Sequence, residues 1–445
     1  MCAGSGWFVV EGSWMIFQMP MERFRRLFKE GFWVILGQVM AVFGSLVGVR
    51  ILTGLMDPSA YGELALGMTA ATLVNQSVLG PLGGGILRFY APAVEQADLG
   101  GYLKAVRRLA LSATGIIVLF MSMIIFVLLI SGRMPWAVVL IAATIFAVLS
   151  GYNAILSGIQ NAARQRSIVA LHQGAESWIR FLVAAGLMLY FGATSVVAMM
   201  GYSLAVLLVL GSQSFFFQKV VPVGGVNKPS ARSWQKQMWD FSWPISVFGM
   251  FTWMQLVSDR WALGVFATTK DVGLYAALFQ IGYYPMSMVT GTAMQFFAPI
   301  FYQQSGDACD TQRNARVKDL SWSLTLLALA GTGVVSLAAF LFHGLIFKIF
   351  VAGEYVSVSY LLPWMLLAGG IFAAGQMLAL NLQSQMKTRV MMTAKIVTAL
   401  LGVILNIAGA YWYGTAGIVA ASILFSVSFF IWMAMLLKKE EQGCL

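Results

Sequence analysis

Charged residues are scarce in this chain. Of its 445 residues only 10% are Asp, Glu, Lys or Arg, whereas 59% are hydrophobic. A soluble globular domain carries about 25% charged residues, so this composition excludes a water-soluble fold. Apolar stretches recur along the whole chain, and each is long enough to cross the roughly 30 Å hydrocarbon core of a bilayer. They do not alternate polar and apolar positions, as the strands of a membrane β-barrel do. The composition therefore predicts an all-α polytopic membrane protein.

Cysteine and histidine are also rare. Cys2, Cys309 and Cys444 lie far apart without the spacing of metal ligands, and His172 and His343 do not make a metal site by themselves. No Gly-x-x-x-x-Gly-Lys-Ser/Thr motif occurs, which argues against an ATP-driven pump. The connections between apolar stretches are too short for a nucleotide-binding domain or for a catalytic loop with clustered carboxylates. We therefore expect no metal, no cofactor and no enzymatic activity.

Twelve apolar segments have the length of membrane spans. They cover residues 31–56, 61–87, 109–131, 136–159, 168–191, 194–217, 238–266, 272–301, 320–350, 359–383, 390–412 and 414–437. The longest polar connection is basic, contains two prolines and two glycines, and separates the first six spans from the last six. This pattern divides the chain into an N-terminal segment 1–30, an N-lobe 31–217, a linker 218–237, a C-lobe 238–437 and a tail 438–445. The composition of residues 1–19 indicates an upstream start codon, with the natural start near Met19 or Met21.

The net charge of +11 is unevenly distributed among the connections. With the N-terminus inside, twenty of the 28 lysines and arginines fall in cytoplasmic segments: Arg23, Arg25, Arg26, Lys29, Lys104, Arg107, Arg108, Arg164, Arg166, Lys219, Lys228, Arg232, Lys236, Arg313, Arg316, Lys318, Lys387, Arg389, Lys438 and Lys439. The opposite side has only Arg133, Lys270 and Lys348. Because cytoplasmic loops of membrane proteins are enriched in Lys and Arg, both termini are predicted to be cytoplasmic. The same bias accounts for the basic charge without nucleic acid as a partner.

Three short patterns occur once in each half of the chain. Arg50 and the following Tyr61-Gly62 match Arg260 and the following Gly273-Leu-Tyr275. The other two matches are Phe89-Tyr90-Ala91-Pro92 with Phe296-Phe297-Ala298-Pro299, and Gln160 and Arg166 with Gln383 and Arg389. Their common order indicates a duplicated six-helix unit. Six spans return the chain to its starting side, so we expect two lobes related by a pseudo-two-fold axis along the membrane normal, with a central cleft between them. This architecture favours a transporter that works by alternating access.

Proline and glycine occur where such a transporter would bend. Pro81, the glycines that follow it, Pro244 and Pro285 lie inside predicted spans and loosen the hydrogen bonding of the helix backbone. We interpret the Gly83–Gly85 run as a kink or a packing site. It lacks the lysine and the strand context of a phosphate-binding loop.

Charged side chains inside the spans are the candidate functional residues, because ionisable groups in a bilayer are costly. Arg180 lies near the middle of the fifth span, and His172, Glu176 and Arg180 share one helix face at spacings of four residues. One interpretation is an intrahelical Glu176–Arg180 pair in a packed lobe. The other is a cavity wall on which Arg180 binds an anionic ligand while Glu176 neutralises it or carries a coupling proton.

Arg50 and Arg260 have equivalent positions in the two halves, and Asp259 precedes Arg260. Arg50 is about 9 Å from the end of its helix, so its charge can reach the outer interface. It can also serve as a substrate contact. For Asp259 and Arg260 the alternatives are a structural pairing between helices and a role in binding substrate or a coupling ion. Lys395 lies near a cytoplasmic end, where snorkelling is the favoured interpretation.

The pattern Arg50…Asp57-Pro58-x-x-Tyr61-Gly62, after a Gly- and Ala-rich first span, resembles bacterial polysaccharide flippases of the Wzx type. The echo Asp259-Arg260…Val272-Gly273-Leu-Tyr275 resembles the entrance to their second lobe. These flippases belong to a superfamily with the multidrug and toxin extruders and the lipid II flippase. The resemblance covers residues 31–437. It implies a V-shaped pair of six-helix lobes that moves undecaprenyl-diphosphate-linked oligosaccharide across the bacterial inner membrane.

Arginine suits such a substrate because its guanidinium binds phosphate in a bidentate manner. We therefore assign substrate binding to Arg50, Arg180 and Arg260, and ion coupling to Glu176 and Asp259, with H⁺ or Na⁺ as the candidate ion. The expected function is to flip lipid-linked repeat units for O-antigen, capsule or exopolysaccharide synthesis, next to membrane lipids and with a polysaccharide polymerase as a candidate partner. The alternative is a cation-coupled multidrug exporter, in which Glu176 or Asp259 binds the drug or ion.

Overall fold

The computed structural model describes residues 21–220, 231–305, 310–385 and 387–442, and all regular secondary structure in that part of the chain is helical. The first half forms α1 (Met21–Leu55), α2 (Pro58–Val74), the π-helix η1 (Asn75–Leu79), α3 (Gly80–Glu95), α4 (Leu99–Ile130), α5 (Met134–Ala162), α6 (Arg166–Phe191) and α7 (Ser195–Val220). The second half forms α8 (Ala231–Phe266), α9 (Thr269–Ile281), α10 (Tyr283–Ser305), α11 (Thr311–Phe350), the 3₁₀-helix η2 (Gly353–Leu361), α12 (Leu362–Ser384) and α13 (Thr388–Gln442). The three cysteines lie outside the described residues.

These elements combine into about twelve passes, as the sequence predicted. The second pass consists of α2, η1 and α3 in succession, and the eighth consists of α9 and α10. The 55-residue α13 contains two passes, because Gly414 has φ 56° and ψ −133° and folds the helix back on itself. A left-handed φ of this kind strains any residue with a side chain. Seven stretches among the described residues are long and apolar enough by themselves to cross a membrane.

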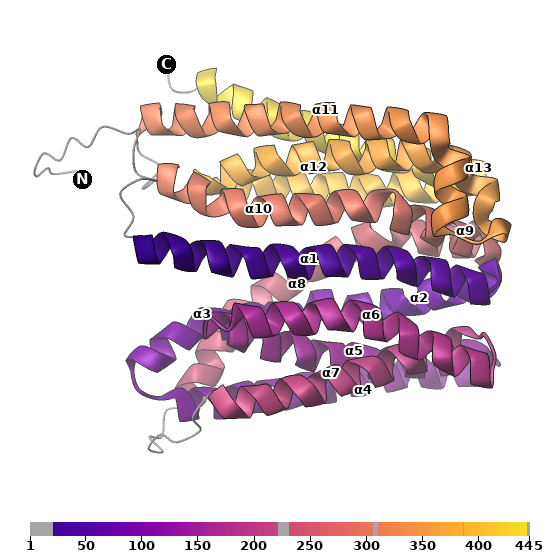
Figure 1. The fold of residues 1–445 in the computed structure, drawn as a ribbon, viewed down its shortest axis with the longest axis horizontal. Helices are drawn as coiled ribbons and strands as arrows, with labels where there is room; N and C mark the ends of the chain where they lie inside the picture. Colours follow the sequence, from indigo (N-terminus) through magenta and orange to yellow (C-terminus); the bar gives the residue numbers. More distant parts are fainter. Residues whose placement is uncertain (1–20, 221–230, 306–309, 386, 443–445) are drawn as a thin grey trace, which may run out of the picture.

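The passes gather into two lobes (Figure 1). In the ribbon, α1 and α3–α7 lie together in indigo and magenta, and α10–α13 lie together in orange and yellow. The fold class is therefore confirmed: the chain is a multi-pass, all-α membrane protein with two lobes. The predicted linker 218–237 is shorter in the structure than in the prediction, since α7 continues to Val220 and α8 begins at Ala231. Residues 221–230 lie outside the described residues.

The two ends of the bundle differ in charge. We call one end the basic end: α1 begins there, and the connections α3–α4, α5–α6, α10–α11 and α12–α13 lie there with most of the predicted basic residues. We call the other the turn end, because it holds the Asp57–Pro58 turn between α1 and α2. Arg133, Lys270 and Lys348 lie at connections or helix ends there. Among the described residues, the helix ends on one side of the predicted topology thus come together at one end.

Helix breaks occur beside two of the three predicted prolines, Pro81 and Pro285, whereas α8 continues as one helix through Pro244. Pro81 has no N–H to donate to the carbonyl four residues earlier, and η1 immediately precedes it, with the Gly80 N–H bonded to the Asn75 carbonyl in an i→i−5 pattern. In the second half, α9 ends before Gly282 and α10 begins with Pro285 in its first turn. The second and eighth passes are therefore both interrupted next to a proline.

The glycine run after Pro81 serves packing as well as bending. A Cβ built on Gly85 would lie 2.5 Å from the Ser242 hydroxyl oxygen and 3.1 Å from the Met238 carbonyl oxygen, both on α8. Gly83 and Gly84 meet nothing within 4 Å. Helices α3 and α8 thus approach each other closely because Gly85 has no side chain.

Candidate functional site

The lobes join at the turn end through the repeated Gly62 and Gly273. A Cβ on Gly62 would lie 1.9 Å from the Thr269 carbonyl oxygen, and one on Gly273 would lie 1.8 Å from the Pro58 carbonyl oxygen. The two contacts are equivalent, because Pro58 and Thr269 are separated by the same number of positions as the two glycines. Between them the Ser59 and Thr269 hydroxyl oxygens are 2.8 Å apart. We call this α2–α9 contact, from 58–62 to 269–273, the seam.

The seam gives a structural reason for the echo in the sequence. Backbones can approach this closely only where neither residue carries a Cβ, and a contact about a pseudo-two-fold axis needs the same residue from both halves. The repeated glycines therefore mark where the lobes meet rather than where each lobe begins.

Arg50 lies beside the seam and is bound to the other lobe. Its Nη1 donates to the carbonyl oxygen of Val351, the residue that caps the end of α11. Thr53 accepts from the Ala352 N–H at 3.2 Å, and the Tyr355 hydroxyl donates to the Met56 carbonyl oxygen at 3.0 Å. The side chain is exposed at the turn end, where the sequence predicted it, and it bridges the lobes there.

Arg260 and Asp259 belong to a buried cluster on α8 and α9. The Tyr275 hydroxyl donates to Asp259 Oδ2 at 2.7 Å, and Arg260 Nη1 lies 3.5 Å from Asp259 Oδ1. The guanidinium also donates to the Leu256 carbonyl oxygen at 3.1 Å, and its carbon is 4.5 Å from the centre of the Phe279 ring. Asp259 is thus paired both along α8 and across to α9. The structure therefore contains the pairing between helices that was one of the two alternatives for Asp259 and Arg260.

Arg180 and Glu176 take different partners in the N-lobe. Asn153 on α5 donates to Glu176 Oε2 at 2.7 Å. The Arg180 guanidinium carbon lies 5.1 Å from the Phe181 ring centre and 5.4 Å from that of Tyr202. Arg180 Nε and Asn153 Oδ1 are two of several buried side-chain polar atoms among the described residues that have no hydrogen-bond partner. Unsatisfied polar atoms of this kind are rare in folded proteins and call for an explanation.

His172, the third member of the predicted stripe, points elsewhere. Its Nε2 lies 3.1 Å from the Ser212 hydroxyl on α7, and its ring meets that of Phe216. The stripe therefore separates into three local contacts. Within the described residues, no group of three His, Cys, Asp or Glu side chains could hold a metal ion.

The three predicted arginines lie in different surroundings. The Arg180 guanidinium packs on Tyr202 of α7. Arg260 lies beside Asp259, which accepts the Tyr275 hydroxyl. Arg50 bonds to Val351 at the turn end, where Tyr61 of the seam is in edge contact with Tyr355.

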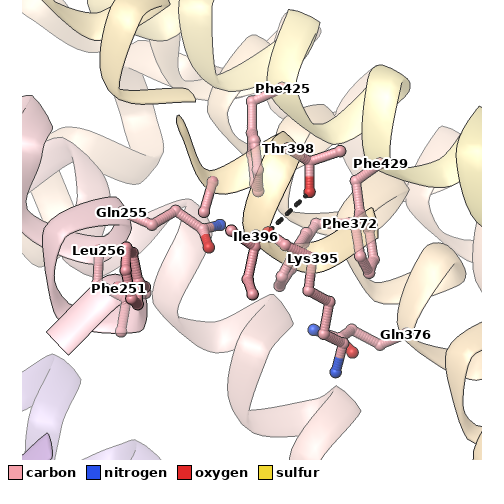
Figure 2. Close-up of a pocket in the computed structure, with 11 residues that line it drawn as sticks. Phe251, Gln255, Leu256, Phe372, Gln376, Lys395, Ile396, Thr398, Phe425 and Phe429 are labelled. Atoms are coloured by element: carbon pink, nitrogen blue, oxygen red, sulfur yellow. Dashed lines mark hydrogen bonds between the residues drawn. The ribbon is translucent and has the colours of Figure 1, made fainter. Parts of the chain in front are cut away.

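An aromatic row extends from Arg260 through the C-lobe. Phe279 stacks on Tyr283 with ring centres 5.0 Å apart, Tyr283 is 6.2 Å from Phe372, and Phe372 is 5.0 Å from Phe429. Phe425 completes the row, 5.6 Å from Phe372. At its far end the row forms one wall of a cavity of about 210 Å³ that contains Lys395 (Figure 2).

The polar residues of this cavity were not identified from the sequence. Gln255 on α8 and Gln376 on α12 line it beside Lys395. The signal was present, since each glutamine lies four residues after a phenylalanine, Phe251 and Phe372, and so shares its helix face. Charge inside a span does not single out these residues, because an amide side chain is uncharged.

No protein-family model and no curated protein sequence matches the chain. Solved structures do. An inward-facing "multidrug resistance MATE family transporter of the MOP superfamily" has a TM-score of 0.70 at 13% identity, covering 91% of this chain and 96% of its own. "Lipid II flippase MurJ, inward closed conformation" has a TM-score of 0.72 at 11% identity, covering 92% and 87%. An outward-facing MATE family transporter has a TM-score of 0.59 at 15% identity, covering 93% and 95%. The chain therefore has the fold of these transporters, which are not enzymes.

Proposed function

We propose that this protein flips undecaprenyl-diphosphate-linked oligosaccharide repeat units across the bacterial inner membrane by alternating access. The observation that carries the proposal is the buried Arg180 Nε without a protein partner. A guanidinium with a free N–H in a low-dielectric site binds a phosphate oxygen strongly. Arg260, on α8 in the other half of the chain, is the second proposed cation, so a diphosphate bound between the lobes would meet a cation from each.

Three features support movement between two states. The lobes are joined at the turn end by the seam and by the Arg50–Val351 bond. The second and eighth passes are both interrupted next to proline, which gives each lobe a point of bending. The TM-score is higher against the inward-facing MATE transporter than against the outward-facing one. If the basic end is cytoplasmic, this difference in TM-score supports an inward-facing state for the structure.

We also propose that transport is coupled to H⁺ or Na⁺ and that a polysaccharide polymerase is a partner. Glu176 and Asp259 are the carboxylates nearest the two arginines, and each has one hydrogen-bond partner from another helix. Protonation or Na⁺ binding at either would change the charge next to an arginine. An H⁺ or Na⁺ gradient could thereby reset the empty transporter.

The alternative, a cation-coupled multidrug exporter, is favoured by one observation, which is that several solved structures of this fold are multidrug transporters. The charges around Arg180 and Arg260 argue against this alternative. Both carboxylates are already paired, Asp259 with Arg260 and Tyr275 and Glu176 with Asn153, whereas Arg180 has a free N–H. A cationic drug would be repelled there.

Complementation tests the proposal. In a bacterium that lacks its oligosaccharide flippase and makes the matching repeat unit, expression of this protein should restore surface polymer. Collapsing the proton gradient or removing Na⁺ should then identify the coupling ion. Cells that express inserted protein yet make no surface polymer, and instead gain resistance to cationic drugs, would reject the flippase in favour of the exporter.

A further inference from the structure

The cavity at Lys395 lies within the C-lobe and is separate from the Arg180 region. Its walls come from α8, α12 and α13. The volume of about 210 Å³ is below the roughly 300–1,000 Å³ of pockets for drug-sized ligands. It therefore suits one small ring or acid group rather than a whole lipid-linked glycan.

Lys395 gives the cavity its charge. It is the only charged residue among the described residues that line the cavity, and it extends from α13 in the same direction as Gln376 from α12 (Figure 2). No carboxylate is present in the described lining to neutralise it. Lys395 is half-buried about two turns from the start of α13. A partly buried ammonium without an acidic partner is costly, so this position favours an anion as its partner and repels a metal ion.

Two amides are available for hydrogen bonds beside the ammonium. Among the described residues, the side chains of Gln255 and Gln376 have no hydrogen-bond partner, while Thr398 donates to the Ala394 carbonyl oxygen. Each amide has a donor and an acceptor end, and so matches hydroxyl groups, which also donate and accept. Hydroxyls placed next to an anionic group are a feature of acidic sugars.

Aromatic rings form the remaining walls. Phe251, Phe372, Phe425 and Phe429 line the cavity, and the last three are in mutual ring contact. The negative face of an aromatic ring attracts positively polarised hydrogens, which the C–H face of a pyranose presents. A simple inorganic anion would leave these faces and both amides unused.

We infer that this cavity is a binding site for an acidic sugar residue, of the hexuronate class, in the transported glycan. Lys395 binds the carboxylate, Gln255 and Gln376 bind ring hydroxyls, and the phenylalanines pack against the ring. The inference rests on the proposed function for its statement that the sugar belongs to the cargo. It makes the C-lobe the part of the protein that distinguishes acidic from neutral repeat units.

Binding to the purified full-length protein in lipid nanodiscs tests the site independently of transport. Methyl glucuronide should bind in calorimetry and raise the unfolding temperature, whereas methyl glucoside, which lacks only the charge, should bind at least about tenfold more weakly. Lys395→Met should remove that difference. Lys348→Met, the same change at an exposed lysine of the turn end, should leave it intact. If acetate protects as well as the glucuronide does, the site takes any small anion and the sugar assignment is wrong.

Two further measurements keep the outcome interpretable. If Lys395→Met does not insert, Gln376→Leu should still weaken glucuronide binding without removing the positive charge; unchanged binding would contradict the amide role. In complementation, Lys395→Met should lower export of a hexuronate-containing repeat unit about tenfold and leave a neutral one unchanged. Equal loss of both would overturn the specificity role. Glucuronide binding without any glycan export would instead leave the site standing and reject the proposed function.

Discussion

Arg180 combines a packing role in the N-lobe with the proposed role in binding phosphate. Its guanidinium rests on Phe181 and Tyr202, and such contacts contribute roughly 0.5–2 kcal/mol to the stability of a fold. Stacking uses the face of the guanidinium and leaves the Nε–H on its edge without a protein partner, so a ligand could bond to it only in a state in which this buried atom is uncovered. The same residue can therefore stabilise the N-lobe and bind phosphate, and the two roles respond differently to substitution.

Replacing Arg180 separates these roles. Arg180→Ala should weaken binding of undecaprenyl diphosphate about 10- to 100-fold, because a charge-assisted hydrogen bond contributes roughly 1.5–3 kcal/mol. Arg180→Lys keeps the charge but loses the fork geometry, so its affinity should be intermediate. Affinity for undecaprenol, which has no phosphate, should be unchanged in both. Binding in nanodiscs, with unfolding temperature measured in parallel, gives both readouts.

Arg133→Ala is the matched control, since this arginine is exposed between α4 and α5. It should change neither affinity nor stability. A fall in unfolding temperature of Arg180→Ala and Arg180→Lys with unaltered diphosphate binding would assign Arg180 to packing alone.

At this scale the sequence was informative about position and less so about partners. Charge in an apolar span identified Arg180, Arg260 and Asp259 because a bilayer makes such residues conspicuous. It could not show that Glu176 would bond to Asn153 rather than to Arg180 one turn away, since that choice depends on how α5 packs on α6. Gln255 and Gln376 carried no charge and were not recognised.

Small residues decide how the helices approach one another. On α1, Gly37, Gly44 and Gly48 face Ala170, Ser177 and Phe181 of α6, and a Cβ at any of them would come within 3.1 Å of those residues. The seam uses the same device between lobes. The difference is in the partner atom, because at Gly62 and Gly273 the obstacle is a carbonyl oxygen of the facing backbone, which cannot rotate away.

Adding a methyl group at the seam should therefore separate the lobes at the turn end. Gly62→Ala or Gly273→Ala would improve local helix propensity by up to about 1 kcal/mol, so the fold should persist while the closed turn end is lost. Each variant should shift the protein toward a state open at the turn end. The distance between spin labels on the turn-end connections of the two lobes should increase.

The double variant provides a stricter test. Once the first methyl group has opened the seam, the second meets no obstacle, so the effects should be clearly less than additive. Gly54→Ala is the control, because this position near the same end of α1 has nothing within 4 Å. Additive effects, or an unchanged label distance in Gly62→Ala, would mean that the seam is not what holds the turn end closed.

Helix breaks were predictable at this scale, and helix extents less so. Proline removes a backbone donor wherever it occurs, and the second and eighth passes are interrupted beside Pro81 and Pro285. The third predicted site, Pro244, lies inside an uninterrupted α8. The predicted spans stopped where hydropathy falls, whereas α11 extends from Thr311 to Phe350 and α7 to Val220. Polar helical ends cost little outside the hydrocarbon, so hydropathy cannot mark where a helix ends.

Two contacts join the halves of the molecule. One is the seam at the turn end, and the other is the packing of α8 along the N-lobe. Trp253 and Trp261 of α8 both donate to Thr69 of α2, at 2.8 and 3.0 Å. Gly249 packs on the Gln76 carbonyl within η1. On the other side, hydrogen bonds to the C-lobe among the described residues include those of Ser45, Arg50 and Thr53, in the half of α1 nearer the turn end, and of Met56, directly after α1.

The sequence could not predict that α1 contacts the C-lobe mainly near the turn end. The repeat predicted two lobes about an axis, and that prediction is confirmed, but a symmetric pattern is compatible with contact at either end. The choice depends on the balance of many weak contacts in one state of a moving protein. The echo of Arg50 at Arg260 also proved unequal, since one bridges the lobes and the other pairs with Asp259.

A disulfide across the seam tests whether closure at the turn end alternates during transport. The Ser59 and Thr269 hydroxyl oxygens are 2.8 Å apart, so Ser59→Cys with Thr269→Cys, in a background without Cys2, Cys309 and Cys444, places two sulfur atoms within reach of a bond. Oxidation should fix the turn end closed and stop export, and a reductant should restore it. Each single cysteine should behave like the background. Because the substrate-loaded protein must open this end to release its cargo, adding substrate should slow cross-linking. Full export by the oxidised double variant would show that the seam stays closed throughout the cycle, and alternating access about this contact would have to be abandoned.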